Sequence, residues 1–290
     1  MLPAENLNSD IKKFWPKNGP SISEVEKYVK KYSKEKIVIK CGGKVLLDES
    51  LLNSLIEDVA ILKKLGLTPI LVHGGGLGIK KKLDTQNIES KFIMGLRVTD
   101  DRMIGVVEDV MTKFNKKIVK ALEKQSCKAK SITVKENNII YVEQENKELG
   151  FVGNPKRVDI KLLKEIIKED FIPVITPMGL DEQGNPYNIN GDTAAGAVAQ
   201  SIKSRRLILL TDIDGVLDNN NKLISEIKTM EAEQLINNEI IHGGMIPKIK
   251  SCSSAIRNGV RAVAIIDGRK PHSILFELFS DRGAGTLIRK

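Results

Sequence analysis

Short runs of β-branched residues alternate with longer helical patterns from residue 36 to near the end of this 290-residue chain. Residues 37–40 and 69–72 form two such runs in the first half, and residues 207–210 and 261–266 form two in the second half. A strand, a helix and a second strand in succession are typical of a parallel sheet, because the helix returns the chain across one face. The sequence therefore predicts an α/β protein with a mainly parallel sheet.

The remaining elements follow from the periodicity of the apolar residues. Helices are expected at residues 50–65, 78–83, 100–124, 159–169, 193–202, 231–237 and 248–258, and a buried strand at 171–176. Residues 130–134 and 139–142 flank Asn137 and Asn138, so we expect them to form a β-hairpin set aside from the parallel sheet. No linker rich in Pro, Gly or Ser divides the chain. We therefore expect two lobes that share one continuous sheet, with their junction near residue 180.

The charge balance is basic, with 46 Lys and Arg against 37 Asp and Glu and a net charge of +9. This excess does not indicate a nucleic-acid-binding protein. The basic residues are scattered in short runs, and aromatic residues make up only 4% of the chain, which leaves few surfaces for base stacking. No apolar run approaches the twenty residues of a membrane-spanning helix.

The cysteines and the first ten residues indicate the cellular compartment of the protein. Cys41, Cys127 and Cys252 are odd in number and far apart in the sequence, so neither a disulfide framework nor a CxxC metal site is available. We expect each of them to be a small buried side chain. Residues 1–10 are polar and acidic, unlike a secretory signal. The sequence predicts a cytoplasmic protein that binds neither nucleic acid nor a membrane.

Two glycine-rich turns follow the first two predicted strands, at Gly42-Gly43 and at Gly74-Gly75-Gly76. The carboxyl ends of parallel strands meet at one edge of a sheet, where glycine lets backbone N–H groups approach a phosphate or a carboxylate. One such turn could exist only for its backbone conformation, but two on neighbouring strands favour an anion site. Neither a Walker A loop nor the dinucleotide fingerprint GxGxxG is present, which argues against a P-loop enzyme and a dinucleotide oxidoreductase.

Three further turns in the second half carry polar residues or glycine. They are Asn188-Ile189-Asn190-Gly191-Asp192, Thr211-Asp212-Ile213-Asp214-Gly215-Val216 and Gly243-Gly244-Met245-Ile246-Pro247-Lys248. Asp192 alone is compatible with a helix cap. The acidic turn after residue 210 is compatible with an ordinary turn or with a contact to a ribose or a metal ion.

In their order along the chain, these segments resemble the motifs of the amino-acid kinase family. The motifs are Lys40-x-Gly42-Gly43, His73-Gly74-Gly75-Gly76, Gly95-Leu96-Arg97-Val98-Thr99, Asn188-x-Asn190-x-Asp192, Thr211-Asp212-x-Asp214-Gly215-Val216 and Gly244-Met245-x-x-Lys248. The resemblance implies a three-layer αβα sandwich with two lobes. The segment around Arg97 is similar to that of members that phosphorylate N-acetyl-L-glutamate with ATP, the second step of arginine biosynthesis. A glutamate 5-kinase and a non-catalytic arginine sensor of the same fold are the alternatives.

The resemblance also implies roles for individual residues. Lys40 and Lys248 would neutralise the transferring phosphoryl group from opposite sides, and Asp192 would hold their ammonium groups. The implied substrate contacts are Gly74, Gly75, Arg97 and Asn188, and the implied ATP contacts are Gly42, Gly43, Thr211, Asp212 and Met245. The acceptor carboxylate is already ionised at neutral pH, so no general base is expected. Mg²⁺ is expected on the phosphates of ATP, without a dedicated protein ligand.

The two ends of the chain are similar to those of arginine-inhibited members of the family. Residues 1–35 would form an extension whose amphipathic helix, at 21–32, links dimers into a hexamer. Residues 36–180 would form the lobe that binds acetylglutamate and dimerises, and residues 181–290 the ATP-binding lobe. The implied contacts to the effector arginine are Glu277, Gly283 and Arg206. A PII-type signalling protein is a further candidate partner.

Overall fold

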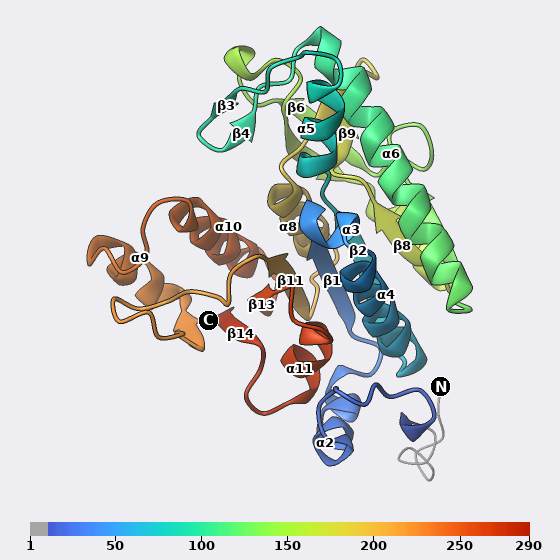
Figure 1. Cartoon of the computed structure of the whole chain (residues 1–290), viewed down its shortest axis with the longest axis vertical. Helices are drawn as coiled ribbons and strands as arrows, with labels where there is room; N and C mark the ends of the chain where they lie inside the picture. The colour runs from blue at the N-terminus through green and yellow to red at the C-terminus, as the bar shows by residue number, and fades with distance from the viewer. Residues whose placement is uncertain (1–10) are drawn as a thin grey trace.

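A central sheet organises the computed structural model, which describes residues 11–290 (Figure 1). Its strands are β1 (Lys36–Cys41), β2 (Thr68–His73), β5 (Ala129–Ile132), β8 (Ile172–Ile175), β11 (Arg206–Thr211), β12 (Glu226–Lys228), β13 (Ala262–Asp267) and β14 (Gly285–Arg289). Their order within these residues is β12-β14-β13-β11-β1-β2-β8-β5, and each neighbouring pair is parallel except β13 and β14. The predicted α/β class and the continuous, mainly parallel sheet are confirmed.

Helices cover both faces of this sheet. The helices of residues 11–290 are α2 (Ile22–Tyr32), α3 (Gly43–Leu47), α4 (Glu49–Lys64), α5 (Gly76–Asp84), α6 (Asp101–Lys124), α7 (Ile160–Lys168), α8 (Gly191–Ser201), α9 (Thr229–Asn237), α10 (Met245–Arg257) and α11 (Ser273–Phe279), of which α5 packs on α6 rather than on the central sheet. Figure 1 shows α4 on one side of the sheet and α10 on the other. Ile37 and Ile39 of β1 belong to the core under α4, whereas Val38 belongs to the core under α8 and α10. Because both faces are buried, the central strands are continuous apolar runs rather than alternating ones.

A smaller sheet lies apart from the central one and contains β10 (Pro186–Asn188), β9 (Met178–Leu180), β6 (Ile140–Gln144) and β7 (Gly153–Val158), in that order. The predicted hairpin of residues 130–134 and 139–142 is therefore wrong. Its first segment is β5, which pairs in parallel with β8, and its second is β6, which pairs antiparallel with β7. Thr133 and Glu136 close a separate turn through a backbone hydrogen bond of 2.8 Å, so the intervening loop carries the chain from one sheet to the other.

A short hairpin of β3 (Phe92–Ile93) and β4 (Leu96–Arg97) interrupts the alternation and projects beside α5 (Figure 1). Met94 and Gly95 form its turn, both with positive φ. The large apolar residues of its tip face solvent, with Met94 95% exposed and Phe92 56% exposed. The hairpin thus adds little to the core, and its Arg97 end reaches the carboxyl edge of the sheet.

The N-terminal helix predicted at 21–32 is α2, which buries Val25, Val29 and Tyr32 against the rest of the chain. The rings of Tyr32 and Trp15 both pack edge-on against Phe279 of α11, at centroid distances of 6.3 and 6.0 Å. The three cysteines are buried and unpaired, as expected. Among residues 11–290, no helix combines the length and the apolar character needed to cross a membrane.

Candidate functional site

Two adjoining cavities open at the carboxyl edge of the central sheet. The smaller cavity, of about 200 Å³, is lined by Lys40, Gly42, Gly43, Gly74, Gly75, Gly76, Ile79, Phe92, Gly95, Leu96, Arg97, Met111, Val152, Pro177, Asn188, Ile189, Asn190 and Gly191. The larger cavity, of about 490 Å³, is lined by Lys40, Gly42, Gly43, Lys44, Val45, Gly76, Leu77, Lys80, Phe92, Arg97, Leu210, Thr211, Asp212, Ile213, Lys248 and Arg269. The residues that line both cavities form a common wall between two ligand-sized spaces; they are Lys40, Gly42, Gly43, Gly76, Phe92 and Arg97.

Two ammonium groups meet on one carboxylate at this wall. Lys40 Nζ lies 2.9 Å from Asp192 Oδ1, and Lys248 donates a hydrogen bond to Asp192 Oδ2. All three side chains are less than one-fifth exposed. Burial alone would raise the pKa of Asp192, but the charges of Lys40 and Lys248 outweigh it and lower that pKa to about 2. The cluster therefore keeps a net positive charge at neutral pH, which favours an anion beside it.

Local structure explains why these three residues meet. Lys40 follows Val38 on the face of β1 that packs against α8, because side chains alternate along a strand. Asp192 lies in the first turn of α8, where Asn190 caps the helix by accepting hydrogen bonds from the backbone of Asp192 and Thr193. Asp192 is therefore not the cap of this helix, and its carboxylate instead forms ion pairs with Lys40 and Lys248. A Cβ on Gly191 would approach Lys40 Cε to 3.1 Å, so glycine leaves room for the lysine side chain.

The low pKa of Asp192 predicts an acid-sensitive contribution to stability. A folded-state pKa near 2 against a usual 3.8 stabilises the folded chain above about pH 4, and this stability is lost as the pH falls through 2. We expect the excess stability of the wild type over Asp192→Asn to shrink by about 2 kcal/mol between pH 5 and pH 2. Urea unfolding of both proteins across this range measures it. A difference independent of pH contradicts the assignment.

Arg97 is a buried cation that faces the smaller cavity. Its side chain donates hydrogen bonds to Ser90 Oγ and, over 3.0 Å, to the carbonyl of Gly76, and its guanidinium lies 4.7 Å from the ring centroid of Phe92. Burial lowers the pKa of Arg97, and no carboxylate among residues 11–290 forms an ion pair with it. A buried cation without a countercharge is costly unless an anion completes the site. The guanidinium is therefore suited to a carboxylate ligand.

The other residues predicted to bind substrate also lie at the smaller cavity. Gly74, Gly75 and Asn188 line it, and Asn188 donates a hydrogen bond of 3.3 Å to Thr99 Oγ1. A Cβ on Gly75 would come within 2.6 Å of Met111 Sδ, so this turn and α6 approach closely only because the residue is glycine.

His73 precedes these glycines but is not suited to proton transfer. It is fully buried, and burial lowers its pKa to about 4. Its Nδ1 lies 3.1 Å from the carbonyl oxygen of Gly74, and its Nε2 lies 3.4 Å from Asn115 Nδ2. The imidazole is therefore neutral at pH 7 and stabilises the turn.

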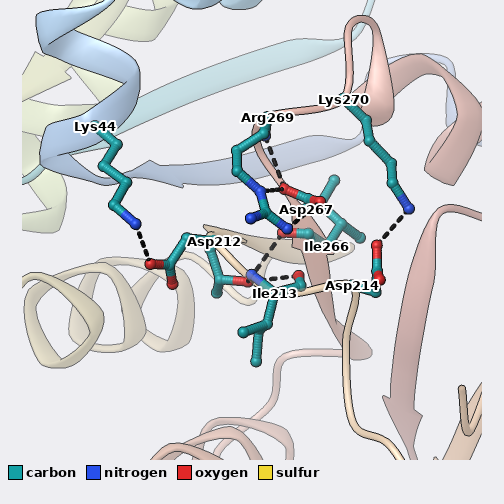
Figure 2. Close-up of polar contacts among 9 residues, drawn as sticks. Lys44, Asp212, Ile213, Asp214, Ile266, Asp267, Arg269 and Lys270 are labelled. Carbon is teal, nitrogen blue, oxygen red and sulfur yellow. Dashed lines mark hydrogen bonds and ion pairs between the residues drawn. The ribbon is translucent and has the colours of Figure 1, made fainter. Parts of the chain in front are cut away.

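The larger cavity is strongly basic. Six cations line it, namely Lys40, Lys44, Lys80, Arg97, Lys248 and Arg269, and Asp212 is the one carboxylate that its lining includes among residues 11–290. Figure 2 shows Lys44 on Asp212, Arg269 on Asp267, and Lys270 on Asp214. Such a balance of charge suits a polyanionic ligand. No group of three His, Cys, Asp or Glu side chains within the described part of the chain could hold a metal ion.

The structure brings most, but not all, of the predicted ATP contacts to this cavity. Gly42, Gly43, Thr211 and Asp212 line it. Met245 is absent from its lining and packs half-buried at the start of α10, against the core under α8 and α10. Sequence reasoning missed Lys44, Lys80, Phe92 and Arg269, of which Lys44 directly follows the first glycine turn.

The three predicted effector contacts also meet, in a separate cavity of about 230 Å³ next to α2. Glu277 is buried, and this burial raises its pKa. Its Oε1 lies 3.9 Å from Arg206 Nε, and its Oε2 accepts a hydrogen bond from the backbone N–H of Ala284. Gly283 has a φ of +68°, and a Cβ there would lie 3.0 Å from Glu277 Oε2. Tyr28, on α2, forms part of the wall.

A model of the amino acid kinase family matches residues 35–267. The chain belongs to this family. It is 58% identical over 275 residues to an acetylglutamate kinase of Pelagibacter ubique (strain HTCC1062), covering 95% of this chain and 96% of that protein. It is 41% identical over 298 residues to an acetylglutamate kinase of Bartonella henselae (strain ATCC 49882), covering 98% and 99%. The family resemblance inferred from the ordered motifs is confirmed.

Solved structures agree on the fold. N-acetylglutamate synthase from Neisseria gonorrhoeae, complexed with coenzyme A and N-acetyl-glutamate, matches with a TM-score of 0.84 and 25% identity, covering 93% of this chain. The match covers 64% of the synthase chain, so this chain corresponds to about two thirds of it. Carbamate kinase from Giardia lamblia bound to AMP-PNP matches with a TM-score of 0.67 at 15% identity, which supports the fold alone.

Proposed function

We propose that this chain transfers the γ-phosphoryl group of ATP to the side-chain carboxylate of N-acetyl-L-glutamate, the second step of arginine biosynthesis. The observation that carries the proposal is the Lys40–Asp192–Lys248 cluster. It lies where the larger, basic cavity adjoins the smaller cavity, which holds a buried arginine that forms no ion pair with residues 11–290. The acetylglutamate kinases to which the chain is similar along almost its whole length support the choice of substrate.

Each cavity is assigned one substrate. The smaller cavity takes acetylglutamate, with its α-carboxylate on the guanidinium of Arg97 and its amide near Asn188. The larger cavity takes ATP, with its ribose near Asp212 and its phosphates among the lysines. We propose the same division for the chain, with residues 36–180 as the acetylglutamate-binding lobe and residues 181–290 as the ATP-binding lobe.

Positioning and charge supply the catalysis. A side-chain carboxylate oxygen of acetylglutamate attacks the γ-phosphorus, the bond from that phosphorus to the β–γ bridging oxygen breaks, and ADP leaves with the electron pair. Lys40 and Lys248 neutralise the charge on the migrating group, while Asp192 fixes their ammonium groups in place. Mg²⁺ would be bound by the phosphates of ATP and would supply further positive charge there, since it dehydrates reluctantly and needs no dedicated protein ligand.

A coupled assay of ADP release tests this function and its alternatives. We expect ADP release with N-acetyl-L-glutamate, and far less with free glutamate or with no acceptor. Faster turnover of glutamate would instead identify a glutamate 5-kinase. Absence of turnover with either acceptor, together with binding of arginine, would identify a non-catalytic sensor.

We also propose that arginine inhibits the enzyme by binding beside Glu277, Gly283 and Arg206. A buried carboxylate paired only loosely with Arg206 is suited to a cationic ligand. Glu277→Gln is expected to raise the arginine concentration for half-maximal inhibition by about tenfold or more, because a charge-assisted hydrogen bond is lost. Its turnover without arginine should match that of the wild type. Equal inhibition of both proteins contradicts the proposal.

The proposed assembly is a dimer of the core that α2 links into a hexamer. The packing of α2 beside the proposed effector cavity supports a role for this helix in coupling assembly to arginine. Analytical ultracentrifugation of the full chain tests the assembly, with a hexamer as the expected species and a dimer as the result that contradicts a linking role for α2. Binding of a PII-type regulator stays a prediction. Adding a purified PII-type protein to the ultracentrifugation experiment tests it, with a heavier complex as the expected species.

A further inference from the structure

One ion pair at the larger cavity joins the two halves of the chain. Lys44, in the first turn of α3, places its Nζ 2.6 Å from Oδ2 of Asp212, which follows β11 (Figure 2). Both residues line the cavity. Their side chains are 56% and 55% exposed, so water and mobile ions screen the pair. It is therefore a weak pair that a more highly charged ligand can break.

The pair conflicts with the proposed binding mode of ATP. A carboxylate held by an ammonium group has one oxygen fewer for ribose hydroxyls, and the same ammonium group is withheld from the phosphates. A triphosphate carries several negative charges into a cavity that Lys40, Lys248 and Arg269 already make positive. The phosphates of bound ATP therefore attract the ammonium group of Lys44 more strongly than the carboxylate of Asp212 does. The same carboxylate is needed to bind the ribose.

We propose that Lys44 binds a phosphate of the nucleotide and exchanges partners when the nucleotide enters. In the free chain its ammonium group holds Asp212, and in the complex it moves to a phosphate oxygen and leaves the carboxylate of Asp212 free for the ribose. Protons and covalent bonds are unchanged in this step. The inference rests on the proposed function, because it takes the larger cavity as the ATP site.

The exchange has a consequence that a purely structural ion pair does not have. A ligand with phosphates forms an ion pair with Lys44, so its affinity falls when the lysine is removed. A ligand without phosphates gains nothing from Lys44 and must still displace it from Asp212, so its affinity rises when the lysine is removed. ATP and adenosine should therefore respond to the same substitution in opposite directions.

Isothermal titration of the full chain with ATP and with adenosine, both in the presence of Mg²⁺, tests this. Lys44→Met is expected to weaken ATP binding about tenfold, the scale of one charge-assisted hydrogen bond, and to strengthen adenosine binding a few-fold. Lys81→Met is the matched control, because Lys81 is exposed on α5 and lines neither cavity. Its two affinities should equal those of the wild type.

The possible outcomes separate the inference from the function on which it rests. Suppose that the wild type binds ATP, and that Lys44→Met changes the affinities for ATP and adenosine in the same direction or leaves the affinity for ATP unchanged. The proposed exchange of partners is then wrong, and the proposed function stands. If the wild type does not bind ATP, the proposed function falls and the exchange falls with it. Asp212→Asn gives a second check, since it should weaken adenosine binding while Lys44 remains available to the phosphates of ATP.

Discussion

Replacement of Lys248 by methionine is expected to lower kcat about 10²- to 10³-fold, by analogy with the loss of one preorganised donor from an oxyanion hole. Methionine retains most of the apolar stem and removes the charge. The KM values for both substrates should change less than kcat, because the lysine acts mainly on charge that develops as the phosphoryl group moves. Steady-state measurement of ADP release at saturating ATP and acetylglutamate gives both quantities.

The same helix provides a control for this prediction. Lys250 is exposed on α10 and lines neither cavity, so Lys250→Met should leave kcat unchanged. Loss of Lys248 leaves Asp192 with Lys40 as its cationic partner, which should raise the pKa of Asp192 from about 2 toward its usual value. If the Lys248→Met protein retains its fold and has the kcat of the wild type, Lys248 has no role in catalysis.

The parallel sheet could be predicted because the local sequence of each central strand shows that the strand is buried. β1, β2, β11 and β13 are apolar along nearly their whole length, as strands buried on both faces must be. β12 has only three residues and is an edge strand, and β14 pairs with β12 and β13, so the pairing of both depends on distant partners rather than on a local pattern. The hairpin prediction failed for the same reason, because β5 pairs with β8, and Ala129 lies opposite Ile172, 43 residues further along the chain.

The candidate site divides along similar lines. The glycine turns and Asp192 belong to motifs that a sequence displays, and the carboxyl ends of parallel strands bring them together. Phe92 gives no such signal, because an aromatic residue in a two-residue strand is compatible with any exposed hairpin. Its position over Arg97 depends on the fold of the hairpin and on Gly76 at the start of α5. Asn190, not Asp192, caps α8, and only the hydrogen bonds decide between two polar residues so close together.

Arg97→Lys is expected to raise the KM for acetylglutamate about 10- to 100-fold, the equivalent of one lost charge-assisted hydrogen bond of about 1.5–3 kcal/mol. Lysine keeps the charge but cannot match the guanidinium, which donates to Ser90 and Gly76, stacks on Phe92 and keeps further N–H groups for a carboxylate. Because the α-carboxylate is bound equally before and during phosphoryl transfer, kcat should change little. Initial rates over a range of acetylglutamate concentrations at saturating ATP measure the split.

The control for this substitution is Arg102→Lys, the same change at a side chain that is 74% exposed on α6 and paired with Asp100. It should leave both constants at their wild-type values. Phe92→Leu should give a smaller rise in the KM for acetylglutamate than Arg97→Lys, because it removes the stacked ring and keeps the charge and both hydrogen bonds. If Arg97→Lys instead lowered kcat and left the KM for acetylglutamate unchanged, the guanidinium would act on the phosphoryl group, and the α-carboxylate would have to bind elsewhere in the smaller cavity.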